Sequence, residues 1–209
     1  MRDTTMRQIL ERLVRSFWRH RVTIRAIRPD DRERLVQAFR ALDKQSIYQR
    51  FLFPKRELSD TELRQITECD GVRVAALVAT VGSGDQQVIV GLGQYARSGA
   101  TADIAFTVRE NFRGWGIAQR LLRRLVRLAR AQGISHFTAD VLADNRPMLR
   151  VFRRSGLPVQ ESQSHGVVHL TLTLAEEDAQ AGAPRGGAIA TESRPFTHPR
   201  PASLDYLGR

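Results

Sequence analysis

Apolar residues recur along 22–174 with two different spacings. Some stretches alternate at every second residue and predict strands, and others repeat every three to four residues and predict helices. Every second side chain of 22–27 is apolar, which is typical of a strand. A helix is predicted from 29 to 42, because Pro29-Asp30-Asp31 supplies a start signal and a first turn. A second helix is predicted over 45–51. A third is predicted over 59–69, because Ser59 and Glu62 have the spacing of a capping box.

The following segment predicts hairpins and then alternating helices and strands. Short turns rich in Gly and Ser separate three strand-like runs, and such turns favour antiparallel pairing. The expected order β-α-α-α-β-β-β-α-β-α-β-β indicates an α/β fold with a mixed, mostly antiparallel sheet of about seven strands flanked by helices. The elements with expected bounds are strands 73–81, 87–97 and 102–108, helix 114–131, strand 136–142, helix 147–154 and strand 167–174.

The helix over 114–131 has the clearest pattern in the chain. Its apolar positions recur at helical spacing and predict a buried stripe, and Gly133 is expected to end the helix. The stripe consists of Ile117, Leu121, Leu125 and Leu128. The opposite face carries five arginines, which we expect to be solvated or to face a partner: Arg120, Arg123, Arg124, Arg127 and Arg130.

Both ends of the chain differ from this central domain, 22–174. Residues 3–19 have helical periodicity, so 1–21 is interpreted as an amphipathic helix that docks on the domain, a second subunit or a partner, with an anionic membrane surface and a transit peptide as alternatives. From 175 to 209 glycine and proline replace the apolar periodicity, which predicts a disordered tail.

Composition narrows the possible partners. The chain has 209 residues and a net charge of +11, and all of its cations except Lys44 and Lys55 are arginines. This charge suits nucleic acid, a membrane or a smaller phosphate-bearing ligand. Apolar runs are too short to span a membrane, no secretory signal is evident, and the single cysteine, Cys69, fits a reducing compartment. We therefore expect a cytoplasmic protein.

One glycine motif carries candidate chemistry. Residues 113–118 read Arg-Gly-Trp-Gly-Ile-Ala and lie between a predicted strand and the start of the helix over 114–131. Glycines let a ligand approach the backbone, and free N–H groups at a helix start favour an anion such as a pyrophosphate. An ordinary glycine turn explains the motif equally well on these residues alone.

With its neighbouring elements, this motif resembles that of the GNAT superfamily of acyl-CoA-dependent N-acyltransferases. The family pattern Arg/Gln-x-x-Gly-x-Gly/Ala is matched by Arg113, Gly116 and Ala118, and 141–149 is similar to the strand-to-helix segment that follows it. Three stretches, 23–31, 46–51 and 57–59, are similar to the acyltransferase domain of bacterial Pat-type protein lysine acetyltransferases. The resemblance covers 22–174.

The resemblance implies a cofactor, acetyl-CoA, and an amine acceptor, with a protein lysine as the expected substrate. Pantetheine would pair with the strand before the motif, the Val108 N–H would polarise the thioester carbonyl, and the amine would attack directly, without an acyl-enzyme. No metal is implied. The residues expected to hold the cofactor are Phe106, Thr107, Val108, Arg113, Gly114, Trp115, Gly116, Ile117, Ala118 and Asn145.

Asp103 is the expected general base, because relatives carry a glutamate at the matching position and an amine must lose a proton before it attacks. Glu110 and Glu68 are weaker substitutes. The alternative is that Asp103 pairs with an arginine or lies at a strand edge. Many relatives have a tyrosine acid where this chain has Phe152, and Phe cannot donate a proton. Tyr48 and Tyr95 are replacements without positional support.

Weaker signals and competing functions remain. Residues 91–96 match the dinucleotide pattern G-x-G-x-x-A but precede a turn, so they are interpreted as a strand of small residues. His165 and His169 lack acidic or cysteine neighbours in sequence, so no metal site is expected.

Two functions other than an active enzyme are the alternatives. One is a catalytically weak acyl-CoA-binding module. The other is a nucleic-acid or ribosome binder, and we do not favour this second alternative because interleaved exposed aromatics are missing.

Overall fold

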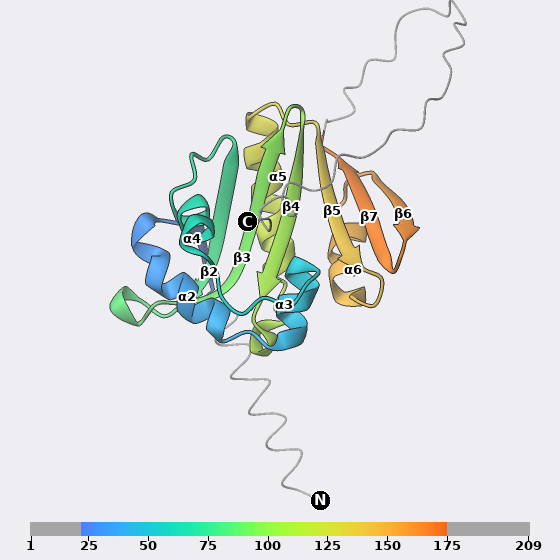
Figure 1. Cartoon of the computed structure of the whole chain (residues 1–209). Helices are drawn as coiled ribbons and strands as arrows, with labels where there is room; N and C mark the ends of the chain where they lie inside the picture. Colours follow the sequence, from blue (N-terminus) through green and yellow to red (C-terminus); the bar gives the residue numbers. More distant parts are fainter. Residues whose placement is uncertain (1–21, 175–209) are drawn as a thin grey trace, which may run out of the picture. The chain divides into compact units, whose positions relative to one another are not determined.

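Seven strands form one open sheet in the order β1-β2-β3-β4-β5-β7-β6 in the computed structural model, which describes residues 22–174 (Figure 1). The predicted helix over 1–21 and the predicted tail over 175–209 lie outside the described residues. The strands are β1 (Thr23–Ala26), β2 (Val74–Val81), β3 (Val88–Ser98), β4 (Thr101–Val108), β5 (His136–Leu142), β6 (Val159–Ser164) and β7 (Val167–Thr173). The helices are α2 (Arg32–Arg40), α3 (Lys44–Phe51), α4 (Asp60–Thr67), α5 (Ile117–Ala131) and α6 (Arg146–Arg153), with short 3-10 turns at Pro29–Asp31, Gly84–Gln86 and Glu110–Phe112.

Helices cover both faces of the sheet, as the sequence predicts. The larger core packs α5 and α6 against one face, where Leu121, Leu125 and Phe152 are fully buried. A smaller core packs α2 and α4 against the other face of β2 and β3. Strand β2 is buried on both faces, which is why it reads as a continuous apolar run rather than as an alternation. All neighbouring strands pair antiparallel except β4 and β5, which are parallel.

The buried face of α5 differs from the predicted stripe. Leu128 is 41% exposed, so its assignment to the stripe is wrong. The buried positions are Ile117, Leu121, Leu122, Leu125, Val126 and Ala129. This face is rotated toward the flank that carries Leu122, Val126 and Ala129, and it leaves Leu128 at its margin. Gly133 follows the helix at φ 70°, the left-handed backbone expected of a terminating glycine.

The arginines of α5 lie on its exposed side as expected, since four of the five are exposed and only Arg120 is partly buried, but three of them also bind backbone carbonyls. Arg120 Nη2 donates to the carbonyl of Val22 at 2.9 Å, and Arg124 donates to the carbonyl of Ile24. Arg130 Nε donates to the carbonyl of Leu174 at 2.6 Å. Side chains on the outer flank of the helix thus reach backbone groups at the margins of the sheet.

The predicted strands agree with the structure within a residue or two, apart from β6. The order of elements predicts a strand between helix 147–154 and strand 167–174 without giving its bounds, and the structure places it at Val159–Ser164. Its side chains are almost all exposed, so no hydrophobic alternation marks it in the sequence. The β6–β7 hairpin fixes it through the register Val159↔Leu172 to Ser164↔Val167.

The glycines of the G-x-G-x-x-A segment have a packing role in β3. A Cβ on Gly93 would lie 2.9 Å from the ring of Phe106 and 3.2 Å from Leu121 Cβ, and one on Gly91 would lie 3.0 Å from Ile117 Cγ2. Small residues therefore let α5 approach the sheet closely. The segment lies within β3 and a hairpin follows it, so its interpretation as a strand is confirmed.

The acidic residues after β1 stabilise the fold through a buried ion pair. Asp31 is fully buried, and its carboxylate accepts from Arg25 Nη1 at 2.5 Å, from Arg25 Nη2 at 2.7 Å and from the N–H of Arg28 at 2.9 Å. Burial alone would raise the pKa of Asp31, but these hydrogen bonds outweigh it and the pKa is lowered. No helix among residues 22–174 combines the length and the apolarity needed to cross a membrane.

Candidate active site

The site forms where β4 and β5 separate. Their parallel pairing covers only three rungs, Thr101↔His136, Ala102↔Phe137 and Asp103↔Thr138. β4 continues to Val108 and β5 to Leu142 without pairing to each other, and Figure 1 shows the two strands diverging toward α3 and α6. The sheet therefore contains a wedge-shaped opening.

Backbone groups of β4 face this opening. The N–H of Arg109 donates to the carbonyl of Val90 at 3.0 Å, so Arg109 is directed toward β3. Antiparallel strands alternate the side on which successive residues present their N–H and C=O groups. Phe106 and Val108 therefore direct theirs toward β5, which is not paired with them at that height. An extended ligand in the wedge would find a strand edge ready to pair.

A cleft of about 750 Å³ occupies the wedge. Its walls come from α3, from β4 with the turn that follows it, from the start of α5, from β5 and from α6. Of the ten predicted cofactor residues, the following line it: Phe106, Thr107, Val108, Arg113, Gly114, Gly116, Ile117, Ala118 and Asn145. Trp115 does not line it; this side chain is buried against Phe112, with ring centroids 5.0 Å apart.

The start of α5 closes one end of the cleft. Gly114 and Gly116 have φ values of 78° and 73°, in the left-handed region that side chains disfavour. Gly116 is the N-cap residue and provides no side-chain cap, so the first N–H groups of α5 have no internal acceptor. These groups and the positive end of the helix dipole favour an anion at this end.

Arg113 is held in place by α3. Its Nη2 donates to Ser46 Oγ at 2.7 Å, and Ser46 Oγ in turn donates to Glu110. Ser46 is buried, and its N–H donates to Asp43 at 2.5 Å. That hydrogen bond is the main cause of a lowered pKa at Asp43. The network fixes the turn before α5 against α3, and it occupies Glu110, one of the weaker candidates for the base.

The cleft is richer in cations than in anions. Arg50, Arg113, Arg150 and Arg154 line it, against Asp140 and Asp144. Burial lowers the pKa of Arg50 to about 10, and the charge of Glu62 opposes this shift, so Arg50 stays protonated at neutral pH. An excess of guanidinium groups favours a polyanionic ligand.

The candidate base lies at the apex of the wedge. Asp103 is exposed in the last β4–β5 rung and accepts a hydrogen bond from Thr138 Oγ1. Asp103 itself does not line the cleft, whose lining on β4 begins at the next residue, Ile104. It forms no arginine pair in the described part of the chain. Glu68 follows α4 and lies outside the cleft lining.

Among residues 22–174, no tyrosine lines the cleft. Phe152 is 1% exposed, lies on the cleft wall and contacts Phe106 with ring centroids 5.9 Å apart. Tyr95 is fully buried and its hydroxyl donates to the carbonyl of Gly71 at 3.3 Å, whereas Tyr48 is 45% exposed on α3. Asn145 begins α6, and its side chain accepts from the N–H of Met148 at 3.3 Å.

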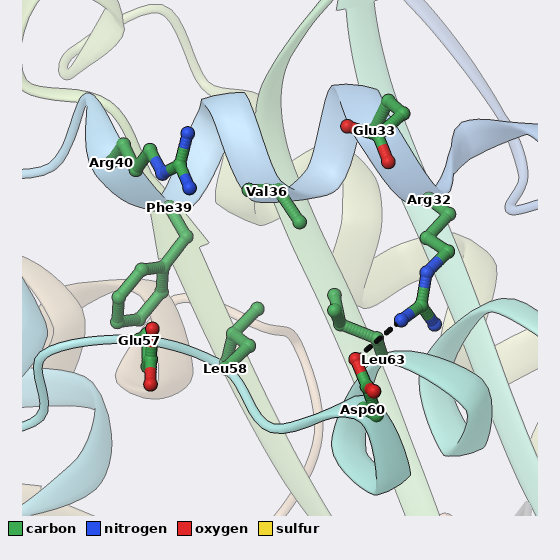
Figure 2. Close-up of a pocket in the computed structure, with 9 residues that line it drawn as sticks. All are labelled: Arg32, Glu33, Val36, Phe39, Arg40, Glu57, Leu58, Asp60 and Leu63. Atoms are coloured by element: carbon green, nitrogen blue, oxygen red, sulfur yellow. Dashed lines mark hydrogen bonds and ion pairs between the residues drawn. The ribbon is translucent and has the colours of Figure 1, made fainter.

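A second, smaller pocket of about 270 Å³ lies between α2 and the segment that leads into α4 (Figure 2). Phe39, Leu58 and Leu63 line it, and Arg32 Nη2 pairs with Asp60 Oδ1 at 2.6 Å. It shares no lining residue with the cleft and lacks its backbone donors, so we assign it no part in the chemistry.

The mixed sheet of residues 22–174 splits at its one parallel strand pair, and a glycine-rich helix start lies at the split. This is the arrangement of acyl-CoA-dependent transferases that the sequence resemblance implies. Residues 21–158 match the family model of the acetyltransferase (GNAT) domain. The chain belongs to this family and is an acyltransferase.

Individual relatives agree with this assignment. Acetyltransferase PA5475 of Pseudomonas aeruginosa is 32% identical over 129 residues, 61% of this chain and 69% of the relative. Acetyltransferase Pat of Mycolicibacterium smegmatis is 28% identical over 136 residues, 64% of this chain but only 40% of the relative. The chain therefore spans less than half of that protein.

Solved structures show the same fold. The GNAT domain of PAT from S. lividans has a TM-score of 0.66 and 33% identity, over 73% of this chain and 90% of that one. The protein yncA of Salmonella typhimurium, solved with its cofactor acetyl-CoA, has a TM-score of 0.60 and 20% identity, over 78% of this chain and 99% of that one. The expected resemblance to Pat-type domains is thereby confirmed.

Proposed function

We propose that this protein transfers the acetyl group of acetyl-CoA to a primary amine, with the side chain of a protein lysine as the acceptor. The observation that carries the proposal is the wedge between β4 and β5. It presents the unpaired N–H and C=O groups of Phe106 and Val108 beside the uncapped start of α5. One ligand with an extended amide-containing arm and a pyrophosphate would use both features.

Acetyl-CoA is such a ligand, and the related acetyltransferase fold of Salmonella typhimurium was solved with it. Its pyrophosphate would accept from the N–H groups at Gly114 to Ala118, and its pantetheine would pair with β4. The N–H of Val108 would then donate to the thioester carbonyl and stabilise the negative charge that develops on that oxygen.

The chemistry requires one proton acceptor and one proton donor. An alkylammonium loses a proton to become the nucleophile, and Asp103 is the proposed acceptor. Nitrogen then attacks the carbonyl carbon, the C–N bond forms, the C–S bond breaks, and the sulfur takes up the second proton that nitrogen loses. Because Phe152 cannot donate, water is the proposed carrier of that proton.

The lysine acceptor rests on the similarity to Pat-type domains, and the reducing cytoplasm is the proposed compartment. The test is to mix purified full-length protein with acetyl-CoA, with and without lysine-containing peptides, and to follow free thiol. We expect amine-dependent thiol release together with acetyl-lysine in the peptide. Normal acetyl-CoA binding without thiol release above the blank would instead favour a catalytically weak acyl-CoA-binding module, which the buried Phe152 supports.

A further inference from the structure

Three side chains form a hydrogen-bonded row across the face of the sheet opposite to α5 and α6. Ser164 Oγ lies 3.0 Å from His169 Nε2, and His169 Nδ1 lies 2.6 Å from Asp140 Oδ1. They come from β6, β7 and β5, which are neighbours in that order, and Asp140 is directly opposite His169 in the register. In Figure 1 none of the helices within 22–174 crosses the front of these three strands.

Of these three residues, only Asp140 reaches the cleft. Asp140 lines the cleft wall, whereas His169 and Ser164 lie behind it on strands farther from the wedge. The side chains of Asp140 and His169 are 37% and 42% exposed, so the carboxylate is open to a ligand. The row therefore joins a cleft carboxylate to two residues with no direct access to the cofactor.

The carboxylate of Asp140 fixes which atom carries the proton in its hydrogen bond with His169. A carboxylate only accepts, so His169 Nδ1 must carry the proton that it shares with Asp140. At Nε2, a neutral imidazole accepts from the Ser164 hydroxyl and an imidazolium donates to it, so the hydroxyl satisfies the ring in either state. Oδ1 of Asp140 is thus engaged, and among residues 22–174 no other ion pair or side-chain hydrogen bond engages Oδ2.

The placement along β5 relates Asp140 to the reacting centre. Thr138, which donates to Asp103, precedes it by two residues on the same strand, and side chains two residues apart point to the same face. At a strand rise of about 3.3 Å per residue, Asp140 follows the apex of the wedge by about 7 Å. It is a carboxylate beside a cleft that is otherwise rich in arginine.

We propose that Asp140 binds the ammonium group of the acceptor, and that His169 and Ser164 are positioning residues that aim its free oxygen into the cleft. The inference rests on the proposed function, because it names the subsite for the amine in the same cleft. The ligand class is a primary alkylammonium with an uncharged stem, such as a lysine side chain. The step is binding alone; proton removal at Asp103 follows it.

The test is a binding titration on full-length protein saturated with coenzyme A, which lacks the acetyl group and so allows no transfer. The probes are Nα-acetyl-lysine methylamide and its neutral norleucine analogue. Asp140→Asn is expected to weaken the lysine probe about tenfold and the norleucine probe less than twofold, because a half-exposed charged hydrogen bond is lost and the stem contacts remain.

The positioning role has its own prediction. His169→Gln is expected to weaken the lysine probe about threefold, and the double variant with Asp140→Asn is expected to bind no worse than Asp140→Asn alone, because the histidine acts only through the carboxylate. His136→Gln is the matched control. His136 lies on β5, the strand that carries Asp140, and its Nδ1 is 2.8 Å from the hydroxyl of Ser135, but it does not line the cleft.

The possible outcomes separate the two proposals. Equal affinity of wild type and Asp140→Asn for the lysine probe, equal weakening of both probes, or additive effects in the double variant would each overturn the inference. No measurable binding of the lysine probe by the wild type would overturn it as well. If the lysine probe binds as expected but no thiol is released from acetyl-CoA, the ammonium subsite stands and the proposed transferase activity fails.

Discussion

The hydroxyl of Thr138 donates to the carboxylate of Asp103 at the last rung before β4 and β5 separate. The candidate base is therefore held at the apex of the wedge by a side chain from the opposite strand. The acetyl-transfer proposal depends on this carboxylate more than on any other single side chain.

Replacing Asp103 tests its role as the base. Asp103→Ala is expected to lower kcat about 10²- to 10⁴-fold, because the amine loses its proton acceptor, and to leave acetyl-CoA affinity unchanged. Steady-state thiol release and a separate acetyl-CoA titration measure the two quantities. Asp85→Asn, an exposed carboxylate in the turn before β3, is the control. Unchanged turnover of Asp103→Ala would remove this residue from the base role.

Gly116 tests the phosphate end of the cleft. Gly116→Ala places a Cβ at φ 73° and beside the open N–H groups of α5, so we expect a loss of about 1 kcal/mol in stability and a several-fold weaker acetyl-CoA affinity. Gly133→Ala is the matched control. It has a similar φ of 70° at the other end of the same helix, so it should lose stability alone.

Thermal unfolding measures the loss of stability in both glycine variants, and an acetyl-CoA titration measures their affinity. If Gly116→Ala binds acetyl-CoA as tightly as the wild type, the start of α5 does not hold the pyrophosphate.

The network that links α3 to the turn before α5 predicts a coupled effect. Ser46→Ala leaves Arg113 and Glu110 without the hydroxyl that joins them. We expect a loss of about 1 kcal/mol in the free energy of unfolding and a several-fold weaker acetyl-CoA affinity. Ser135→Ala also removes a hydroxyl hydrogen bond, at 3.0 Å to the carbonyl of Ala100, but Ser135 does not line the cleft, so the affinity of this variant for acetyl-CoA should not change. A matching loss of affinity in both variants would contradict the coupling.

The ion pair of Asp31 and Arg25 predicts the acid stability of the domain. The pKa of Asp31 is lowered in the folded state, so its stabilisation is complete above the unfolded pKa near 3.9 and is lost as the pH falls through the folded value. Asp31→Asn leaves Arg25 without its carboxylate and should cost about 3 kcal/mol at pH 7, and less below pH 4. Denaturant unfolding at pH 7 and pH 3 measures the difference.

Glu161→Gln provides the comparison for this ion pair. Glu161 pairs with Arg153 at 2.7 Å on the surface, where the pairing contributes little. Equal losses from Asp31→Asn and Glu161→Gln at pH 7 would contradict the special role of the buried pair.

Local patterns in the sequence predict most of the fold and the backbone part of the site. The motif 113–118 predicts the helix start, because glycine spacing and helix polarity are local properties. Leu128 shows the limit of such reasoning. Its spacing suits the stripe of α5, but which flank of a helix is buried depends on where the sheet ends beneath it.

The side-chain contacts in and behind the cleft join residues that lie far apart in sequence. Ser46 reaches Arg113 across 67 positions, and Asp140 reaches His169 across 29, through a strand register that depends on an inconspicuous hairpin. The sequence identifies His169 only by its spacing to His165, which lies in the β6–β7 turn at φ 49°. The sequence signal that could have identified the Asp140–His169 pair is the alternation of polar residues along the two predicted strands that carry them.

The arginines of α5 also bear on the solubility of the protein. Strand β1 lies at the edge of the sheet and pairs only with β2 among the described strands. Alternate residues of this segment direct their carbonyls away from β2, toward the side where a strand of another molecule would bind. Arg120 and Arg124 donate to two of these outward carbonyls, at Val22 and Ile24. The guanidinium groups thus occupy the carbonyls through which a second molecule would add its own strand. This disfavours edge-to-edge association of the sheet at β1.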